Sequence, residues 1–240
     1  MPNRSSSLEK LIYLIVGLFF LNSCSPPLYI PNTTNTPSLL RQGDTEIGIS
    51  TGSNGWDGQF ATAVTNNFSA MLNGSYANQP ASRSEYNKHH FLELGLGYTY
   101  IFNKEALGTY NLKYFFSGFA GGGAGSSEGR MSGEELNGDY SRFFIQPSIG
   151  FTDKNFDVII ALRTSWVNFT TIKHNQLNYY QVEGDYQNIF YEPTFTFKAG
   201  AEHFKFFTQV GFSIEENQYA AFRQRPIIFI IGIQGNLNWK

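Results

Sequence analysis

The chain has 240 residues, of which 41% are hydrophobic, 17% aromatic and only 15% charged. This composition excludes disordered chains, which are poor in aromatic residues, and coiled coils, which are rich in charged helix formers. A formal net charge of −2 offers no electrostatic basis for binding nucleic acid. The single cysteine excludes an intramolecular disulfide framework and a multi-cysteine metal cluster. A mean hydropathy of −0.27 excludes a helical membrane bundle but not a membrane β-barrel, whose strands are apolar only at alternate positions.

The N-terminus has the pattern of a bacterial lipoprotein. A basic start precedes an apolar run over residues 11–21, which is too short for a spanning helix and typical of a secretory signal. Leu21-Asn22-Ser23-Cys24 follows and resembles the lipobox, in which the cysteine is lipidated and becomes the first residue. We therefore expect residues 1–23 to be a lipoprotein signal peptide and Cys24 to carry acyl chains such as palmitate. The alternative is a free cysteine that happens to end a signal peptide.

The stretch after the cysteine contains four prolines and no hydrophobic period. Such a composition is typical of an extended linker. Residues 24–43 are therefore predicted to be a lipidated cysteine with a proline-rich tether, which joins the anchor to a domain over residues 44–240.

Apolar residues alternate with polar ones through most of that domain. Near the C-terminus one face holds Ile227, Phe229, Ile231, Ile233, Leu237 and Trp239, and the other holds Gly232, Gln234, Asn236 and Asn238. A period of two indicates β-strands and is incompatible with a helical stripe. The predicted strands cover about residues 45–51, 57–65, 68–78, 90–102, 109–121, 140–151, 156–169, 188–200, 205–214 and 226–238.

The connections between these strands alternate in length. Short ones are expected at residues 66–67, 103–108, 152–155 and 201–204, and long polar ones at residues 79–89, 122–139, 170–187 and 215–225. Outer-membrane barrels combine short periplasmic turns with longer external loops in this way. The fold class is therefore all-β: a closed antiparallel up-and-down transmembrane β-barrel of about ten strands, with eight to twelve as the alternative range. An even strand number places both termini on the periplasmic side of a bacterial outer membrane, next to the expected lipid anchor.

A soluble lipocalin-like barrel is the alternative with the same periodicity. It would bury its apolar face and expose its polar face to water. The polar face predicted here consists mainly of Gly, Ser, Thr and Gln, and it has fewer charges than a solvated surface normally carries. Aromatic residues such as Tyr98, Tyr100 and Trp239 also gather near strand ends, where membrane barrels have aromatic girdles. Both features favour the membrane barrel.

Assigning the polar faces to the lumen places nine charged residues inside. Charges in a narrow interior must pair or be neutralised, so this set predicts a salt-bridged plug rather than a proton path. We expect the lumen of a ten-stranded barrel to be scarcely wider than its own side chains and therefore closed. The lumenal charge cluster comprises Glu46, Glu93, Lys113, Arg142, Asp157, Arg163, Glu192, Lys198 and Glu215.

No catalytic, cofactor or metal site is predicted. The glycine-rich run over residues 121–129 lacks the Lys-Ser/Thr pair and the following helix of a phosphate-binding loop. His89 and His90 point to opposite faces of a strand, so they cannot hold one metal ion together. Four residues of the outer loops, Ser126, Asp139, His174 and Asp185, have the chemistry of a hydrolase but no spacing signature. We therefore expect a non-enzymatic component, with a loop-borne hydrolase or acyltransferase, a small pore and a lipocalin-like ligand binder as alternatives.

Three short motifs carry a resemblance to a known group of proteins. They are Cys24-Ser-Pro-Pro, the stretch Tyr29-Ile-Pro-Asn-Thr-Thr-Asn-Thr-Pro37 leading to Leu39-Leu40, and Gln146-Pro-Ser-Ile-Gly150. With them the chain resembles the small outer-membrane β-barrel lipoproteins of Bacteroidetes-type bacteria, which have no established activity. The acidic residues that often follow the cysteine in surface-exported members are absent, so the resemblance implies a periplasmic anchor. It implies outer-membrane lipid as a partner, and we expect the external loops to bind another envelope protein.

Overall fold

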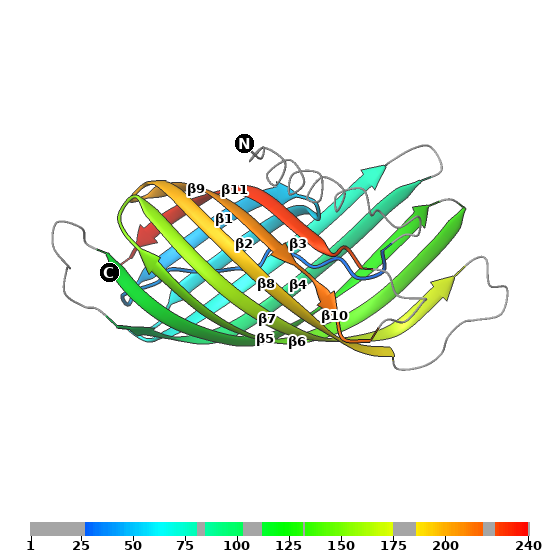
Figure 1. Cartoon of the computed structure of the whole chain (residues 1–240), viewed down its shortest axis with the longest axis horizontal. Helices are drawn as coiled ribbons and strands as arrows, with labels where there is room; N and C mark the ends of the chain where they lie inside the picture. Colours follow the sequence, from blue (N-terminus) through cyan, green and yellow to red (C-terminus); the bar gives the residue numbers. More distant parts are fainter. Residues whose placement is uncertain are drawn as a thin grey trace, which may run out of the picture.

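The computed structural model describes residues 27–80, 85–102, 112–131, 133–174, 186–217 and 224–239. These residues form an all-β structure, which Figure 1 shows from the side. The strands are β1 (Asp44–Gly52), β2 (Gly55–Ala63), β3 (Phe68–Pro80), β4 (Tyr86–Ile101), β5 (Lys113–Met131), β6 (Glu134–Thr152), β7 (Phe156–His174), β8 (Tyr186–Ala201), β9 (Phe204–Phe212), β10 (Ile214–Glu215) and β11 (Ile227–Asn238). Among the described residues there is no helix that is long and apolar enough to cross a membrane.

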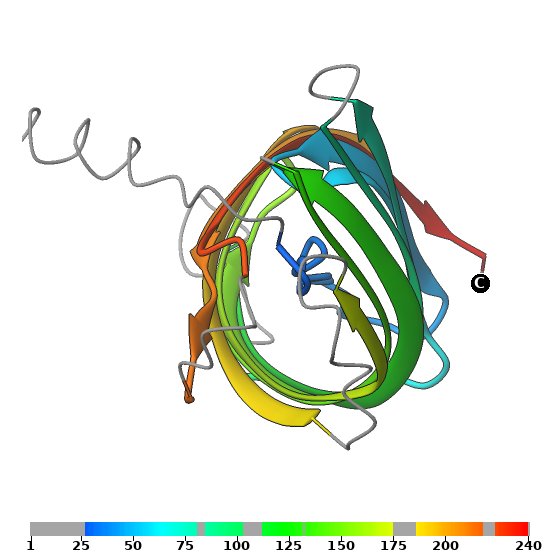
Figure 2. The ribbon, with the colours of Figure 1, turned by 90° about the vertical axis from the view of Figure 1, so that its right-hand side faces the viewer.

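Ten of these strands close into one antiparallel barrel. Consecutive strands pair from β1 to β9, β9 pairs with β11, and β11 pairs with β1 through nine residue pairs from Asp44↔Asn238 to Gly52↔Ile230. The two-residue strand β10 pairs only with β8 and is not part of the ring. Figure 2 shows the closed ring of strands from one end. The predicted up-and-down barrel of about ten strands is confirmed.

Several strands are longer than expected, and one predicted loop is a hairpin. Residues 122–139 were expected to form a long connection, but β5 continues to Met131 and β6 begins at Glu134. The glycine-rich run is part of β5, and glycine is needed there because a side chain would collide with the neighbouring strand β4. A Cβ atom on Gly121 would lie 2.1 Å from the backbone oxygen of Leu94, and one on Gly123 would lie 2.3 Å from that of Leu92. The glycines therefore permit close strand contact, and loop-like composition was misleading here.

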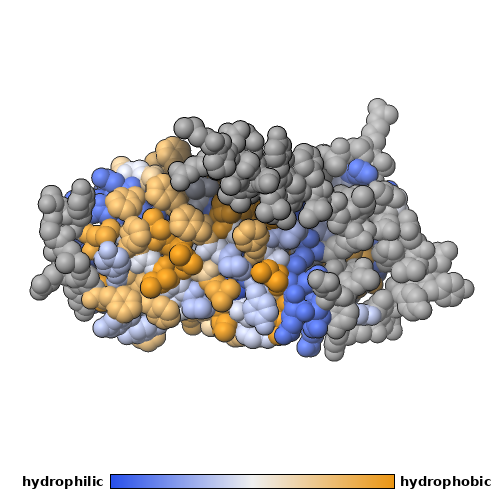
Figure 3. Space-filling model, in the orientation of Figure 1, coloured by the Kyte–Doolittle hydropathy of each residue, from blue (hydrophilic) through white to orange (hydrophobic). Residues whose placement is uncertain are grey.

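The barrel is apolar outside and polar inside. Along β4, Leu92, Leu94 and Leu96 point outward and are 59%, 63% and 69% exposed, while Glu93 between them is buried. The same alternation gives exposed large apolar residues on every strand of the ring. On β5 and β6 they lie in the part of the strand away from the β5–β6 hairpin, as Phe116 and Ile149 show. Figure 3 shows these apolar side chains covering the outer face from the left end to the middle, followed by a polar zone.

The ring has a tall wall and a low wall. Each of β5, β6 and β7 has 19 residues, whereas each of β1, β2 and β9 has 9. We call β4–β8 the tall wall and β1, β2 and β9 the low wall. The turns of residues 64–67, 153–155 and 202–203 lie at one end of the barrel, here the short-turn end, together with Asp44 and Asn238. The tall wall projects at the opposite end, here the tall end.

Candidate functional site

The first described residues run through the inside of the barrel. Residues 28–39, which we call the plug segment, are buried except for the half-buried Ser38. At the tall end the hydroxyl of Ser127 on β5 donates to the backbone oxygen of Leu28 (2.5 Å). At the short-turn end the amide and hydroxyl of Ser38 both donate to Glu46 Oε1 of β1 (2.9 and 2.6 Å). The segment therefore crosses the lumen from one end to the other, as the blue trace inside the ring of Figure 2 shows.

This placement corrects two expectations. The proline-rich stretch was predicted to be an extended tether between the anchor and the barrel domain, but residues 28–39 of it lie inside the barrel. The lumen was expected to be no wider than its own side chains, yet it holds an extended polypeptide as well. The prolines and the lack of alternation do indicate an extended chain, and nothing in that pattern shows where the chain lies. The signal peptide and Cys24 lie outside the described residues, so their assignments stay predictions.

Apolar side chains fix the plug segment at its two ends. Leu28 and Tyr29 are buried in an aromatic cluster on the tall wall, where the Tyr29 ring stacks on Phe190 with ring centres 4.2 Å apart. Leu39 packs into a second cluster with the walls' Met71 and Phe144. Burying a leucine or tyrosine ring stabilises the bound segment by about 1.5–3 kcal/mol for each side chain. These contacts hold the ends of a segment that has no strand partner along most of its length.

The middle of the plug segment is polar and uncharged. Its sequence Asn32-Thr33-Thr34-Asn35-Thr36 lacks any titratable group. The side-chain amide of Gln209 pairs with both backbone groups of Thr34, accepting from its N–H (2.9 Å) and donating to its oxygen (2.8 Å). Gln146 donates to the backbone oxygen of Asn35 (2.7 Å) in the same way. Amide side chains of the wall thus satisfy backbone groups that a neighbouring strand would otherwise satisfy.

Four buried charges surround the plug segment at mid-height. Arg163 Nε donates to Glu192 Oε2 (2.7 Å), and Arg163 Nη1 lies 3.4 Å from Glu93 Oε1. Arg142 pairs with the other oxygen of Glu93. The four side chains are almost fully buried, with exposed fractions of 0–1%. Two carboxylates and two guanidinium groups give a neutral set, which is the condition for burying charge at low cost.

The plug segment connects to this network through two residues. The hydroxyl of Tyr29 accepts from Arg142 Nη1 (2.8 Å) and donates to Glu192 Oε1 (2.9 Å). Asn32 accepts from Arg142 Nη2 (2.7 Å) and donates to Glu93 Oε1 (3.1 Å), and its backbone oxygen accepts from Arg163 (3.0 Å). Each charged group therefore has at least one neutral partner on the plug besides its ionic partner on the wall, and Arg142 has two.

Nearer the short-turn end the charges form separate pairs. Lys198 Nζ lies 2.9 Å from Glu46 Oε2, and Lys205 Nζ lies 2.8 Å from Asp157 Oδ1. Lys205 was not among the predicted lumenal charges, although it lies between the outward-facing Phe204 and Phe206 and its strand periodicity could have revealed it. A further buried carboxylate, Asp57, accepts from the hydroxyl of Thr33 (2.5 Å).

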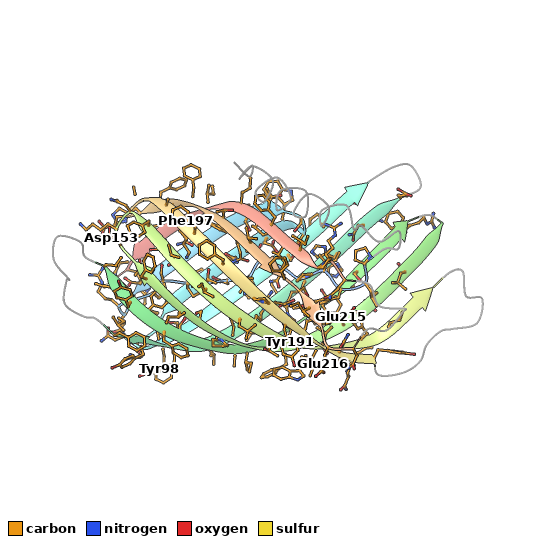
Figure 4. All side chains as sticks on the ribbon, in the orientation of Figure 1. Tyr98, Asp153, Tyr191, Phe197, Glu215 and Glu216 are labelled. Carbon is orange, nitrogen blue, oxygen red and sulfur yellow. The ribbon has the colours of Figure 1, made fainter. Side chains whose placement is uncertain are left out.

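The structure brings most of the predicted charge cluster together. Lys113 and Glu215 differ, because they are half-buried at the two opposite ends of the barrel and form no ion pair with any described residue. Figure 4 shows Glu215 and Glu216 toward the tall end, far from Asp153 and Tyr98 at the other end. The predicted members inside the lumen are Glu46, Glu93, Arg142, Asp157, Arg163, Glu192 and Lys198.

Above the apolar zone the tall wall carries a polar collar on its outer face. We use this name for Tyr86, Lys88, Glu128, Arg130 and Glu135, which come from neighbouring strands. Arg130 pairs with Glu135, and Lys88 lies 3.8 Å from Glu128. The hydroxyl of Tyr86 donates to Glu128 Oε1 (2.7 Å), and this hydrogen bond raises the pKa of Tyr86 to about 12. The collar is exposed and held by interactions across strands.

The residues with hydrolase chemistry that the structure describes, Ser126, Asp139 and His174, do not come together as a Ser-His-Asp triad. Ser126 lies 3.3 Å from a ring nitrogen of His90 and opposite Asp139 in the strand register. In a Ser-His-Asp triad the histidine must lie between the other two side chains, whereas here the serine does. His174 pairs with Leu136 at the end of β7, and Asp185 lies outside the described residues. In the parts of the chain that the structure describes, no three metal-ligating side chains of His, Cys, Asp or Glu gather at one point.

Comparisons with known proteins assign no family to this arrangement. No protein-family model matches the chain, and no curated protein matches it either.

Proposed function

We propose that the protein is a non-enzymatic outer-membrane β-barrel lipoprotein whose exposed tall end binds another component of the envelope. The observation that carries the membrane part is the inverted distribution of polarity. Large apolar side chains such as Leu94, Leu96 and Phe206 are more than 60% exposed, while arginine and glutamate are buried inside. A water-soluble protein does not cover most of its outer surface with such residues, whereas lipid is a favourable environment for them.

Strand length and aromatic residues support the same proposal. Even the low wall has 9 residues per strand, which is enough to cross a bilayer in a tilted barrel, for which about 9–11 residues are needed. Trp56 and Tyr76 are exposed on one side of the apolar zone, and Tyr98, Tyr100 and Trp239 on the other. These positions are those of the two aromatic girdles of a membrane barrel.

The lipocalin-like alternative fits the lumen poorly. A lipocalin binds an apolar ligand in an apolar interior. In this barrel the interior combines ion pairs and amides with two apolar clusters, and the chain's own residues 28–39 occupy it and fill those clusters. The described part of the molecule therefore offers no apolar lumenal cavity to such a ligand.

The plug segment changes where the lipid anchor is expected. Cys24 precedes Leu28 by four residues, a span of at most about 14 Å. Leu28 lies at the tall end, opposite to Asp44 and Asn238. A lipidated Cys24 would thus insert its acyl chains at the tall end, not beside the C-terminus as the sequence analysis expected. With the tall end outside the cell, the anchor enters the outer leaflet.

One fractionation experiment tests membrane insertion apart from lipidation. The Cys24→Ser variant cannot carry acyl chains, so a barrel that spans the membrane stays in the pellet after an alkaline carbonate wash. Release of this variant, with retention of the wild type, would instead show a peripheral barrel held only by its lipid. Labelling with palmitate provides the companion measurement, because the wild type takes up label and Cys24→Ser does not.

A second experiment tests the binding surface and its side of the membrane. A photo-crosslinking residue at Lys88 in the collar is expected to capture an envelope protein in living cells. The matched control carries the same residue at Lys154, in a turn at the short-turn end. Equal capture from both positions, or none from Lys88, would contradict the proposed role of the tall end.

A further inference from the structure

We propose that the lumen is a peptide-binding site that residues 28–39 occupy as a removable plug, and that releasing this plug opens a hydrophilic pore when no lipid anchor on Cys24 holds its N-terminal end. The inference rests on the proposed membrane location, because a pore has meaning only in a bilayer. It goes beyond that proposal in giving the lumen a ligand, an extended peptide that is uncharged in its middle and apolar at both ends.

The wall of the barrel does not need the plug segment to close. All ten strands pair with two neighbours each, and the ring is completed by β1 and β11. Between residues 28 and 39 the only backbone contact with a strand-like partner is the bridge of Tyr29 to Gln224, and Gln224 is not in the ring. Removing the segment therefore breaks no hydrogen bond of the barrel ladder.

The lumenal charges are also balanced without the plug. Each ion pair inside the described barrel joins two wall residues, as in Arg163–Glu192 and Lys198–Glu46. The plug segment contains no charged residue and contributes only neutral hydrogen-bond partners. Water can replace neutral partners of this kind at little enthalpic cost. An emptied lumen would therefore be hydrated and lined by paired charges, and it would not collapse around unpaired ones.

The contacts of the segment are those of a bound ligand. Apolar ends anchor it in two separate clusters, and the wall recognises its middle through amide side chains, above all Gln209 and Gln146. Gly138 provides space for Leu28, since a Cβ atom at that glycine would lie 2.7 Å from Leu28 Cδ1. The wall is thus shaped for this segment.

A disulfide lock tests the inference while the plug stays in place. The hydroxyl groups of Thr36 on the plug and Thr196 on β8 are 3.2 Å apart, so cysteines at these positions place their sulfur atoms side by side, and non-reducing electrophoresis of a protease digest establishes the disulfide. The full chain with Cys24→Ser, Thr36→Cys and Thr196→Cys is refolded and inserted into a planar bilayer in potassium chloride. A chain with Cys24→Ser and Thr36→Cys alone is the matched control.

The variant that gives the clearest result combines the disulfide lock with weakened apolar contacts at both ends of the plug segment. Adding Tyr29→Ser and Leu39→Ser to the lock removes an apolar contact at each end, and reduction should then raise the current by about tenfold or more. The oxidised form of the same protein should stay closed. A synthetic peptide of residues 28–39, added to the reduced protein, should suppress the current again, and a peptide of scrambled sequence should not.

The outcomes separate this inference from the proposed function. Protein that inserts but carries the same current when oxidised and reduced overturns the removable plug. Current that persists with the peptide at saturating concentration overturns the peptide site. Failure of every variant to insert, the control included, contradicts the membrane location itself, and the inference falls with it.

Discussion

The tall wall and the low wall of the barrel differ in strand length, in their outer surface and in the side chains they place in the lumen. In the low wall, the nine-residue strand β9 carries outward apolar residues over its whole length, namely Phe204, Phe206, Val210 and Phe212. In the tall wall, β4, β5 and β6 continue past the apolar zone, and their outer face changes to the polar collar. The same wall also supplies the arginines of the buried network, Arg142 and Arg163. The low wall thus has about the length that the proposed membrane crossing requires, and the tall wall adds the polar collar on the outer face and the buried arginine network in the lumen.

The largest expected effect is on the buried network of the tall wall. Arg163→Met leaves the carboxylates of Glu192 and Glu93 without one of their partners, and breaking a buried pair of this kind costs about 3–5 kcal/mol. The free energy of unfolding of the refolded barrel, measured by urea titration, should fall by this amount. Adding Glu192→Gln removes one of the stranded charges and should restore part of the loss. No recovery in the double variant would contradict the ionic explanation.

The next effect tests the boundary between the apolar zone and the collar. Leu94→Arg places a charge in the middle of the outer face and should destabilise the inserted barrel by about 2–4 kcal/mol if that face meets lipid. His90→Arg is the matched control, because it lies on the same strand and the same face, two repeats of the alternating pattern nearer the collar. The free energy of folding of both variants is measured by reversible folding into lipid vesicles. Similar losses in the two variants would contradict a boundary between His90 and Leu94.

A smaller effect is expected for the paired charges near the short-turn end. Lys198→Met leaves Glu46 with the amide and hydroxyl of Ser38 as its remaining partners. The cost of losing one partner of a buried polar group is about 1–3 kcal/mol, below that of Arg163→Met. Urea unfolding of the two single variants in the same detergent gives the order, and a larger loss for Lys198→Met would reverse the comparison.

The smallest effect is expected in the collar. Arg130→Ala removes an exposed ion pair with Glu135, and water screens such pairs, so the unfolding midpoint should not change measurably. The same substitution should weaken capture of a partner by the crosslinker at Lys88 if the collar is a contact surface. Unchanged capture would restrict the contact to other parts of the tall end.

The sequence predicts the barrel better than its contents. A period of two is strong in strands such as β4 and β11, so the strand number and the inward position of Glu93 and Arg163 follow from it directly. The glycines of β5 were mistaken for a loop, because their reason for being there is close contact with β4, which no local pattern records. The plug segment was missed for a similar reason. Its contacts, such as Thr34 with Gln209, join residues 175 positions apart in the chain.

The plug segment also places a condition on the order of assembly. Residues 28–39 come directly before β1, and the seam between β1 and β11 shuts the ring around them. The chain must therefore either lie across the forming sheet before its last strand joins its first, or be drawn through a finished cylinder. In the first case the early residues act as a core on which the sheet wraps. A folded domain fused ahead of residue 27 then remains compatible with the barrel, since nothing has to pass through the ring once it has shut.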